Sequence, residues 1–309
     1  MNYYSITDIN ANLADSPESF VIDCEAQYDK MLRIVAEDIR RHANERPIAL
    51  IAGPSGSGKT TTAHRLERLL DGAGLQSHTL SMDDYYADGT RNKDVVDQYG
   101  NPDYESPRRL DTDLLNTQLL RLARCEPVEL PQFNFAAQKQ EKSGRILRRR
   151  PNELIVMEGI HALNPEVTGG TTSCANKIYL SVRTRVTDDA QHLHPSLIRF
   201  ARRLIRDRRT RGRDIMELCE LLPSISRGEN LYIMPYKHLA THELDTFIPY
   251  ELSAYRNILL EELRRVSQLP GSIPELRTLL QFLEKIAPMD SEWIPEISLV
   301  REFIGGQCL

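Results

Sequence analysis

Short apolar runs alternate with amphipathic segments along the first half of the chain. Residues 48–52 and 154–157 are apolar enough for buried strands, 77–82 has the pattern of another strand, and 60–70 carries leucines on one side at helical spacing. A strand, a helix and a strand within about forty residues form the βαβ unit of an α/β fold. The pattern therefore predicts a mainly parallel sheet flanked by helices, with ligands beyond the carboxyl ends of its strands.

The rest of the chain divides into periodic and irregular segments. Apolar residues at helical spacing predict helices, and proline and glycine mark the loops. The expected helices are 24–44, 111–124 with Asp111 as its cap, 195–213, 250–266 and 273–286; the expected strands are 177–183 and a small β-excursion of 128–130 with 146–147; the irregular segments are 1–23, a substrate loop at 87–109, and a loop through Pro223, Gly228 and Pro235.

Composition and charge exclude several classes of protein. The 309 residues, 40% hydrophobic and 27% charged, are typical of a globular protein with a sizeable core. No apolar run approaches the roughly 18 residues that span a bilayer, and the N-terminus does not resemble a signal peptide, so we expect a cytoplasmic protein without a membrane partner. The net charge of −5 gives no global reason to expect nucleic acid. Five dispersed cysteines indicate reduced thiols.

The strongest motif follows the first strand. Residues 53–60 read Gly-Pro-Ser-Gly-Ser-Gly-Lys-Thr and fit G-x-x-x-x-G-K-[ST], with a strand before and a helix after. Its glycines let successive backbone N–H groups face phosphate oxygens at the positive end of the helix dipole. Lys59 would reach the β- and γ-phosphates and act in catalysis, and Thr60 would bind Mg²⁺. The predicted nucleotide cradle consists of Gly53, Ser55, Gly56, Ser57, Gly58, Lys59, Thr60 and Thr61.

Acidic residues follow two of the expected strands. Asp83 and Asp84 come directly after 77–82, and a carboxylate there could accept the proton of an acceptor hydroxyl or help to hold Mg²⁺. Spacing alone does not separate the two, although we favour Asp83. Glu158 ends the 154–157 run, where such proteins keep the acid that orients Mg²⁺. We expect His161 to be a structural hydrogen bonder.

An arginine-rich segment lies in the second half of the chain. Eight arginines fall within residues 199–213, and four of them share one helical face. We favour a lid that closes over the triphosphate, since a phosphate cradle elsewhere supplies the anion. A solvated face paired with acids and an RNA-binding stripe are the alternatives. The residues of the face are Arg199 and Arg202, predicted to be catalytic, and Arg203 and Arg206, predicted to bind the nucleotide. The cluster Arg145, Arg148, Arg149 and Arg150 is expected at the surface.

Several motifs together resemble the uridine kinase/phosphoribulokinase family. They are residues 53–61, Ser-Met-Asp-Asp-Tyr-Tyr at 81–86, Pro-Gln-Phe-Asn-Phe at 131–135, Glu-Gly-Ile-His-Ala-Leu-Asn at 158–164 and the arginine pattern of 199–213. The match is similar to the bacterial uridine kinase-like branch, which also ends in a segment like Arg-Glu-Phe-Ile-Gly-Gly at 301–306. Many members of that branch carry N-terminal domains related to threonyl-tRNA synthetase, for which we expect no room here.

The resemblance implies a P-loop kinase fold and ATP–Mg²⁺-dependent phosphorylation of a nucleoside 5′-hydroxyl. It makes Asp83 the base in preference to Asp84, and the arginine helix the lid. Thr60, Asp83 and Glu158 would surround the metal. The implied parts of the chain are an N-terminal lead-in and docking helix at 1–46, a P-loop kinase core with substrate loop and lid at 47–249, and a C-terminal helical extension at 250–309.

The chain departs from the family where the nucleoside should bind. Typical uridine–cytidine kinases read Pro-Asp-Ala-Phe-Asp, with the first Asp on the ribose hydroxyls, but this chain has Arg108 at that position. Their Pro-x-Tyr-Asp-Phe segment and the base-contacting His after it are matched by Phe133, Asn134 and Gln138. An arginine there could favour an anionic or differently shaped alcohol. The expected acceptor residues are Asp83, Tyr86, Arg108, Phe133 and Gln138.

Three hypotheses follow from the sequence. The leading one is a kinase that transfers the γ-phosphoryl group of ATP to a small-molecule alcohol, uridine or a similar nucleoside. A kinase of a sugar or a carboxylated metabolite is the second. The third is a nucleotide-gated RNA-binding or regulatory protein with the arginine face on RNA. The segment 92–95 reads Asn-Lys-Asp-Val, not N-K-x-D, which argues against a GTPase.

Overall fold

A five-stranded parallel sheet lies at the centre of the protein, which we describe from a computed structural model over residues 2–188 and 191–307. Its strand order is β10-β7-β2-β6-β3. The strands are β2 (Ile48–Ala52), β3 (Ser77–Ser81), β6 (Leu154–Glu158), β7 (Ala175–Ser181) and β10 (His242–Asp245). All neighbours pair in parallel. The predicted α/β fold with a mainly parallel sheet is therefore confirmed.

Alternation along β2 divides the interior into two cores. Ala49 and Ile51 face a core shared with the helices on one side of the sheet, and Ile48 and Leu50 face a second core on the other side. Successive side chains of a strand point to opposite faces, and both faces here are covered, so the strand is apolar throughout. Its five residues are at most 1% exposed. This rigid strand fixes the position of the loop that follows it.

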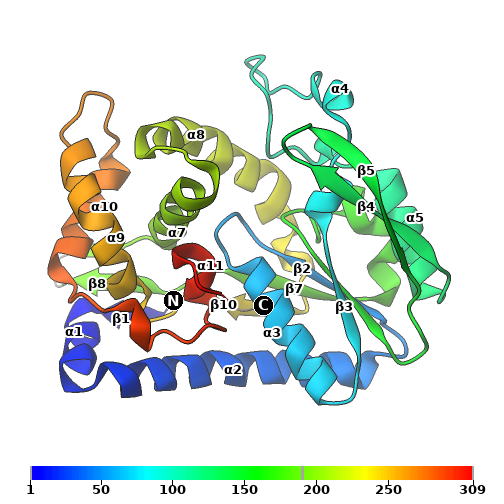
Figure 1. The fold of residues 1–309 in the computed structure, drawn as a ribbon, viewed down its shortest axis with the longest axis horizontal. Coiled ribbons are helices and arrows are strands. Elements are labelled where there is room, and N and C mark those ends of the chain that lie inside the picture. The colour runs from blue at the N-terminus through cyan, green and yellow to red at the C-terminus, as the bar shows by residue number, and fades with distance from the viewer. Residues whose placement is uncertain (1, 189–190, 308–309) are drawn as a thin grey trace.

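Helices cover the sheet unequally. The first core receives α1 (Ile6–Asp15), α2 (Pro17–His42), α3 (Lys59–Gly72), α7 (Pro195–Arg211), α8 (Ile215–Gly228), α9 (Glu251–Val266), α10 (Pro274–Lys285) and α11 (Leu299–Ile304). The second core receives α5 (Thr112–Ala123), α6 (Pro165–Thr168) and the hairpin of β4 (Val128–Asn134) and β5 (Lys139–Leu147). Figure 1 shows α9 and α10 at one end of the molecule, the hairpin and α5 at the other, and α2 along one edge.

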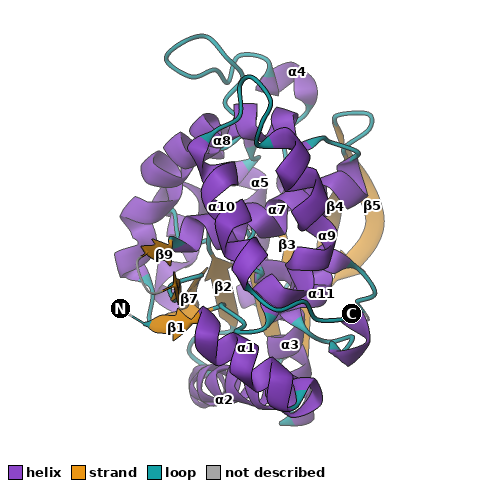
Figure 2. Ribbon diagram, turned by 90° about the vertical axis from the view of Figure 1, so that its left-hand side faces the viewer, coloured by secondary structure: helices purple, strands orange, loops and turns teal. Residues whose placement is uncertain are grey.

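Smaller elements complete the structure. A second sheet joins β1 (Tyr3–Ser5), β8 (Arg185–Asp188) and β9 (Gln191–Leu193). The short helix α4 (Gly89–Asn92) lies within the predicted substrate loop, on the side of the molecule away from α1 and α2 (Figure 2). No helix in the part of the chain that the structure describes is long and apolar enough to cross a bilayer. Four cysteines there, at 24, 125, 174 and 219, are free; Cys308 lies outside the described residues.

Two segments expected to be irregular are helical. Residues 1–23 contain β1, α1 and the start of α2, because Ser5 and Ser16 cap the two helices and Pro17 opens the second. The expected loop through Pro223 contains α8, which begins with a capping box of Asp214 and Glu217 and accommodates Pro223 within the helix. The cap signals outweigh the loop-like composition in both places.

One basic residue expected at the surface is buried. Arg149 is 7% exposed, and its guanidinium donates to the carbonyls of Leu122 and Ala123 at the end of α5 and to that of Glu153 before β6. The last carbonyls of a helix lack partners within the helix. Arg149 therefore joins the end of α5 to the start of β6, which explains its burial without an acidic partner.

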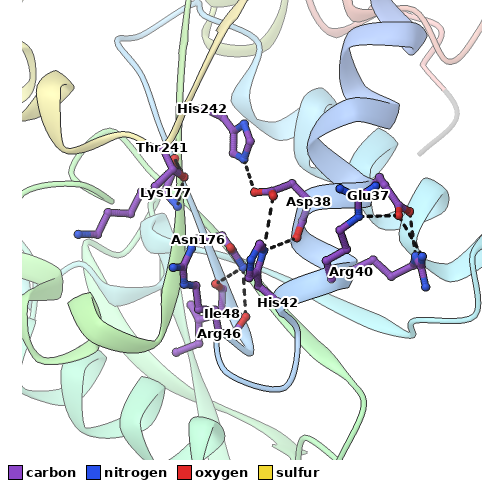
Figure 3. Close-up of polar contacts among 11 residues, drawn as sticks. Glu37, Asp38, Arg40, His42, Arg46, Ile48, Asn176, Lys177, Thr241 and His242 are labelled. Atoms are coloured by element: carbon purple, nitrogen blue, oxygen red, sulfur yellow. Dashed lines mark hydrogen bonds and ion pairs between the residues drawn. The ribbon is translucent and has the colours of Figure 1, made fainter.

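Polar contacts fasten the end of α2 to the sheet (Figure 3). His242 of β10 lies 2.7 Å from the carboxylate of Asp38, and the ring of His42 lies 2.8 Å from the carbonyl of Asp38. The side chain of Asn176 in β7 donates to the carbonyl of Arg46 at 3.1 Å. These contacts hold the turn between α2 and β2, so α2 is anchored on the central sheet.

Candidate active site

The glycines of the predicted cradle occupy positions that other residues would strain. Gly56 and Gly58 have φ of 76° and 79°, the left-handed region that favours glycine. A Cβ on Gly53 would meet the carbonyl oxygen of Leu180 at 2.2 Å. The loop therefore turns tightly between β2 and α3, and it presents the first N–H groups of α3 at the carboxyl edge of the sheet, as an anion site requires.

The remaining cradle side chains lie around this turn. The ammonium group of Lys59 donates to the carbonyl of Pro54 at 3.4 Å, within its own loop. The hydroxyl of Ser57 is buried and has no hydrogen-bond partner among the described residues. Thr62 bonds back to the carbonyl of Gly58 at 2.7 Å and to the hydroxyl of Tyr28 in α2 at 2.6 Å. The helix α2 thus supports the cradle from behind.

Two strand ends bring the acidic residues to the cradle. Glu158 pairs in register with Ser81, whose hydroxyl donates to its carboxylate at 2.9 Å, and Thr60 donates to the same oxygen at 3.4 Å. Burial raises the pKa of Glu158 to about 7, and Lys59 opposes the rise. The carboxylate is thus held beside the cradle, and no side chain within the described residues forms an ion pair with it.

Asp83 follows the end of β3 by two residues, in a short 3₁₀ segment, Met82–Tyr85. The side chain of Asp83 is exposed, but nearby protein atoms reduce the hydration of its carboxyl and so raise its pKa. The charge of Lys59 is the largest effect opposing that rise. Burial also raises the pKa of Asp84; the largest charges acting on it are that of Asp83, which adds to the rise, and that of Arg145 in the hairpin, which opposes it. The charge of Lys59 thus acts on the carboxyls of both Asp83 and Glu158, while Asp84 lines the same cavity as Thr60 and Glu158.

The residues around Glu158 fit a magnesium ion held largely by phosphates. No group of three or more His, Cys, Asp or Glu side chains within residues 2–188 and 191–307 forms a ready metal cage. Mg²⁺ usually keeps one or two protein oxygens and takes the rest from phosphates and water. The hydroxyl of Thr60 and the buried carboxylate of Glu158 supply such oxygens. A cation there would also relieve the cost of ionising a buried acid.

The arginine helix α7 lies over the cradle. Arg199 donates to the carbonyl of Ser55 at 3.2 Å and forms a two-point ion pair with Glu229 at 2.6 and 2.8 Å. Arg203 and Arg206 reach the hydroxyl of Ser55 at 3.1 and 3.5 Å. These three guanidinium groups are partly buried and contact the phosphate loop itself, which is the position expected of a lid.

Arg202 has a different environment from its three neighbours. It is fully buried and bonds to both carboxylate oxygens of Glu251 at 2.7 and 2.9 Å. Its Nη1 donates to the carbonyl of Gly56 at 3.0 Å, and the Nη2 that bonds to Glu251 also donates to the carbonyl of Thr246 at 2.6 Å. The guanidinium is fully engaged by protein groups. This placement gives no support to a catalytic Arg202, and we infer that it braces the cradle from inside.

A buried aspartate that the sequence analysis did not select balances the arginines. Asp207 is 0% exposed, and four arginines of the cluster, Arg203, Arg206, Arg211 and Arg213, lie within ion-pair distance of its carboxylate. The solvated-face alternative is therefore partly correct, because acids do pair with this cluster. The pattern Arg-Asp-Arg at 206–208 was the available signal.

The predicted acceptor residues separate into an aromatic cluster and two exposed side chains. The ring of Phe133 lies 5.5 Å from that of Tyr86 and 5.0 Å from that of Phe135. Arg108 is exposed on the loop before α5. Gln138 is also exposed, and its amide donates to the carbonyl of Phe135 at 2.7 Å within the hairpin turn. The structure brings Tyr86 and Phe133 together but holds Gln138 against its own hairpin.

The predicted substrate loop contains acidic residues that the sequence analysis did not select. Glu105 is 8% exposed, burial raises its pKa, and the charges of Arg203 and Lys59 oppose the rise. His161, predicted to be structural, is buried in the same region, and burial lowers its pKa to about 4. Asp103, also buried, accepts from the hydroxyl of Tyr232 at 2.9 Å and pairs with Arg227 at 3.0 Å. Asp-Tyr-Glu at 103–105 was the available signal.

A cavity of about 490 Å³ opens beside the two strand ends. Thr60, Ser81 and Glu158 line it from the cradle side, and Gln132 and Arg145 line it from the hairpin. A volume of this order can hold a small ligand. The cavity therefore continues the cradle toward the hairpin β4–β5.

This combination of a parallel sheet, a glycine loop between β2 and α3, and acids at the adjoining strand ends defines a P-loop phosphotransferase. The model of the "Phosphoribulokinase / Uridine kinase family" matches residues 48–243, and the chain belongs to this family. Accordingly it is a phosphotransferase that acts on an alcohol acceptor, a small molecule, with ATP as the phosphate donor.

Relatives named uridine kinase support the assignment. The one from Lactobacillus helveticus (strain DPC 4571) is 31% identical over 202 residues, which are 63% of this chain and 85% of that protein. The one from Lactobacillus johnsonii (strain CNCM I-12250 / La1 / NCC 533) is 33% identical over 201 residues, 64% of this chain and 85% of that protein. The crystal structure of a putative fructose transport system kinase from Silicibacter sp. TM1040 matches with a TM-score of 0.50 and 16% identity, over 69% of this chain and 98% of that one. This last likeness concerns the fold alone.

Proposed function

We propose that the protein transfers the γ-phosphoryl group of ATP, with Mg²⁺, to the 5′-hydroxyl of a nucleoside of the uridine or cytidine type. The observation that carries the proposal is the meeting of Lys59, Asp83 and Glu158 at the carboxyl ends of neighbouring strands. Lys59 is the leading opposing charge on both carboxyls. Phosphoryl transfer requires such positioning of a cation, a base and a metal ligand rather than covalent chemistry by the protein.

The proposed roles follow from the contacts. The N–H groups of residues 53–61 and the ammonium of Lys59 would hold the phosphates, and Thr60 and Glu158 would hold Mg²⁺, which would supply charge neutralisation to the phosphate oxygens. Asp83 accepts the proton of the attacking hydroxyl. Arg199, Arg203 and Arg206 lie on the phosphate loop already, and we assign them to the charge that develops on the transferred group.

The acceptor is placed against the aromatic cluster. Tyr86 follows Asp83 by three residues, and Phe133 and Phe135 extend its apolar surface along the hairpin. A flat base can stack on such rings, and aromatic stacking tolerates different bases. This arrangement supports a nucleoside over a small sugar, and in the proposed binding mode the 5′-hydroxyl faces Asp83.

Arg108 supports a second candidate, a kinase of a non-nucleoside alcohol that carries an anionic group. Its side chain is exposed on the loop that ends at α5, where the resemblance to uridine kinases led us to expect an aspartate for the ribose hydroxyls. Guanidinium groups favour carboxylates and phosphates over neutral diols. A hydroxy acid would therefore use Arg108 in a way that uridine does not.

The RNA-binding alternative loses its main support. Arg202 is buried against Glu251, and Asp207 pairs with four further arginines, so the helix does not present a free basic stripe.

The dispersed free thiols suit a reducing compartment, and a cytoplasmic location is part of the proposal.

An acceptor panel tests the proposal. Uridine, cytidine, purine nucleosides, fructose and glycerate are offered with Mg·ATP, and phosphorylated products are measured for the wild type, Phe133→Ala and Arg108→Ala. We expect turnover of a pyrimidine nucleoside that falls in Phe133→Ala chiefly through a raised KM. Turnover of glycerate alone, lost in Arg108→Ala, would establish the second candidate. No turnover of any nucleoside would reject the first.

A further inference from the structure

The C-terminal segment, residues 298–307, packs directly on the phosphate cradle. Leu299, Val300 and Phe303 are fully buried. A Cβ on Gly58 would meet the side chain of Leu299 at 2.4 Å, so the glycine of the cradle is shaped to this segment. Figure 1 shows α11 between α7 and the start of α3. The segment thus forms a wall of the donor site, although it lies about 240 residues from the cradle in sequence.

One carboxylate from this wall binds the cradle. Glu302 accepts a hydrogen bond from the backbone N–H of Thr61 at 3.3 Å and another from the hydroxyl of Thr61 at 2.6 Å. The amide of Gln307 donates to the same hydroxyl at 2.6 Å. The carbonyl of Glu302 accepts from Arg209 of α7 at 3.1 Å. Both donors of Thr61 are therefore directed at a protein anion.

Thr61 lies in the first turn of α3, where the N–H groups have no partner within the helix and attract anions. These groups are the ones that a P-loop offers to nucleotide phosphates. A phosphate oxygen and the carboxylate of Glu302 cannot both accept from the N–H and the hydroxyl of Thr61. Two anions in one position also repel each other, so one must leave.

We propose that Glu302 sets the affinity for the donor nucleotide by occupying a phosphate position on Thr61, so that the nucleotide binds only as this carboxylate leaves. The proposal rests on the donor cradle of the proposed function. It makes the C-terminal segment an internal competitor for the N–H and the hydroxyl of Thr61.

The surroundings indicate that the side chain moves while the segment stays. Ser298 is buried and bonds to the hydroxyl of Tyr250 at 2.8 Å, and the guanidinium of Arg202 lies over the ring of Phe303 at 5.2 Å. The guanidinium of Arg301 donates to the carbonyl of Ile294 at 2.7 and 3.1 Å. Glu302 itself is only partly buried. A rotamer change that turns its carboxylate toward solvent removes the anion from Thr61 without unfolding α11, while the amide of Gln307 still donates to the hydroxyl of Thr61.

The test compares the wild type with Glu302→Gln and with Glu296→Gln, which removes the same charge from an exposed position just before that segment. Calorimetry measures the Kd of Mg·ATP, of tripolyphosphate and of adenosine, and thermal unfolding checks the fold. We expect Glu302→Gln to bind Mg·ATP and tripolyphosphate about tenfold or more tightly, since a charged hydrogen bond no longer competes. Adenosine, which has no phosphate, should bind the wild type and Glu302→Gln equally. Glu296→Gln should bind all three ligands with the Kd values of the wild type.

Other results would contradict the proposal in distinct ways. Equal or weaker binding of both phosphates by Glu302→Gln would overturn it, because Glu302 would then support the cradle or be indifferent to it. Tighter binding of adenosine as well would indicate a base contact instead of phosphate competition. If Glu302→Gln unfolds, Glu302→Asp takes its place in the test. This variant withdraws the carboxylate by one methylene and must also bind Mg·ATP and tripolyphosphate more tightly than the wild type. Failure of the wild type to bind any phosphate would reject the donor cradle, and with it the proposed function.

Discussion

Replacing Arg202 with methionine tests whether this arginine supports the fold or serves as part of an open lid. The side chain is 0% exposed and its partner Glu251 is also 0% exposed. Removing the guanidinium leaves a buried carboxylate without its counter-charge, together with unpaired carbonyls at Gly56 and Thr246. Breaking a buried pair in this way costs about 3–5 kcal/mol. We therefore expect Arg202→Met to lose a stability of that order.

Urea unfolding of the nucleotide-free protein at pH 7 measures the loss. Arg264→Met is the matched control, because Arg264 pairs with Glu284 at the surface, where both side chains are more than 40% exposed and such pairs contribute about 1 kcal/mol or less. The double variant Arg202→Met/Glu251→Leu should regain much of the loss, since it removes the stranded charge. If Arg202→Met loses no more free energy of unfolding than Arg264→Met, the reasoning is refuted and Arg202 is again a candidate residue of the lid.

Three further predictions concern Glu158, Lys59 and the N-terminal cap of α5. The free energy of unfolding of the nucleotide-free protein should fall by about 3 kcal/mol between pH about 4.5 and 7, because burial raises the pKa of Glu158 to about 7 and its ionisation opposes folding. Urea unfolding at several pH values measures this fall, and Glu158→Gln should lack the contribution of Glu158 to it. Lys59→Met should bind ATP more weakly and lose nearly all turnover, measured by calorimetry and product formation, and normal turnover would exclude Lys59 from the phosphate site. Asp111→Ala should lose about 1 kcal/mol in urea unfolding, because Asp111 caps α5 through the N–H of Leu114, and an unchanged midpoint would contradict that cap.

The sequence predicted the parts of the fold that local patterns determine. The apolar run at 48–52, the glycine motif and the leucines after it specify strand, turn and helix within one short stretch, and all three are confirmed. The position of Glu158 beside Ser81 could also be inferred, because parallel strands deliver their carboxyl ends to one edge. The helices before residue 24 and around Pro223 were missed, because serine caps and a capping box lie in segments whose proline and polar content is typical of loops.

The rest of the site depends on contacts between distant segments. Helical spacing placed Arg199, Arg202, Arg203 and Arg206 on one face of the helix. Only the packing of α9 shows that Arg202 forms a buried ion pair with Glu251, which leaves it unavailable to a ligand. Likewise, no local pattern connects Glu302 with Thr61, which lie 241 residues apart. Burial by remote elements, rather than spacing, decides which charged side chains remain available to a ligand.

The measurement that tests the central claim most directly is the turnover of the best acceptor by Asp83→Asn and Asp84→Asn, each with its ATP affinity from calorimetry. Asp83→Asn keeps the shape and removes the base, so its turnover should fall about 10²–10⁴-fold while ATP still binds. Asp84→Asn should stay close to the wild type. Full turnover in Asp83→Asn, or a selective loss in Asp84→Asn, would contradict the assignment of Asp83 as the base of this kinase.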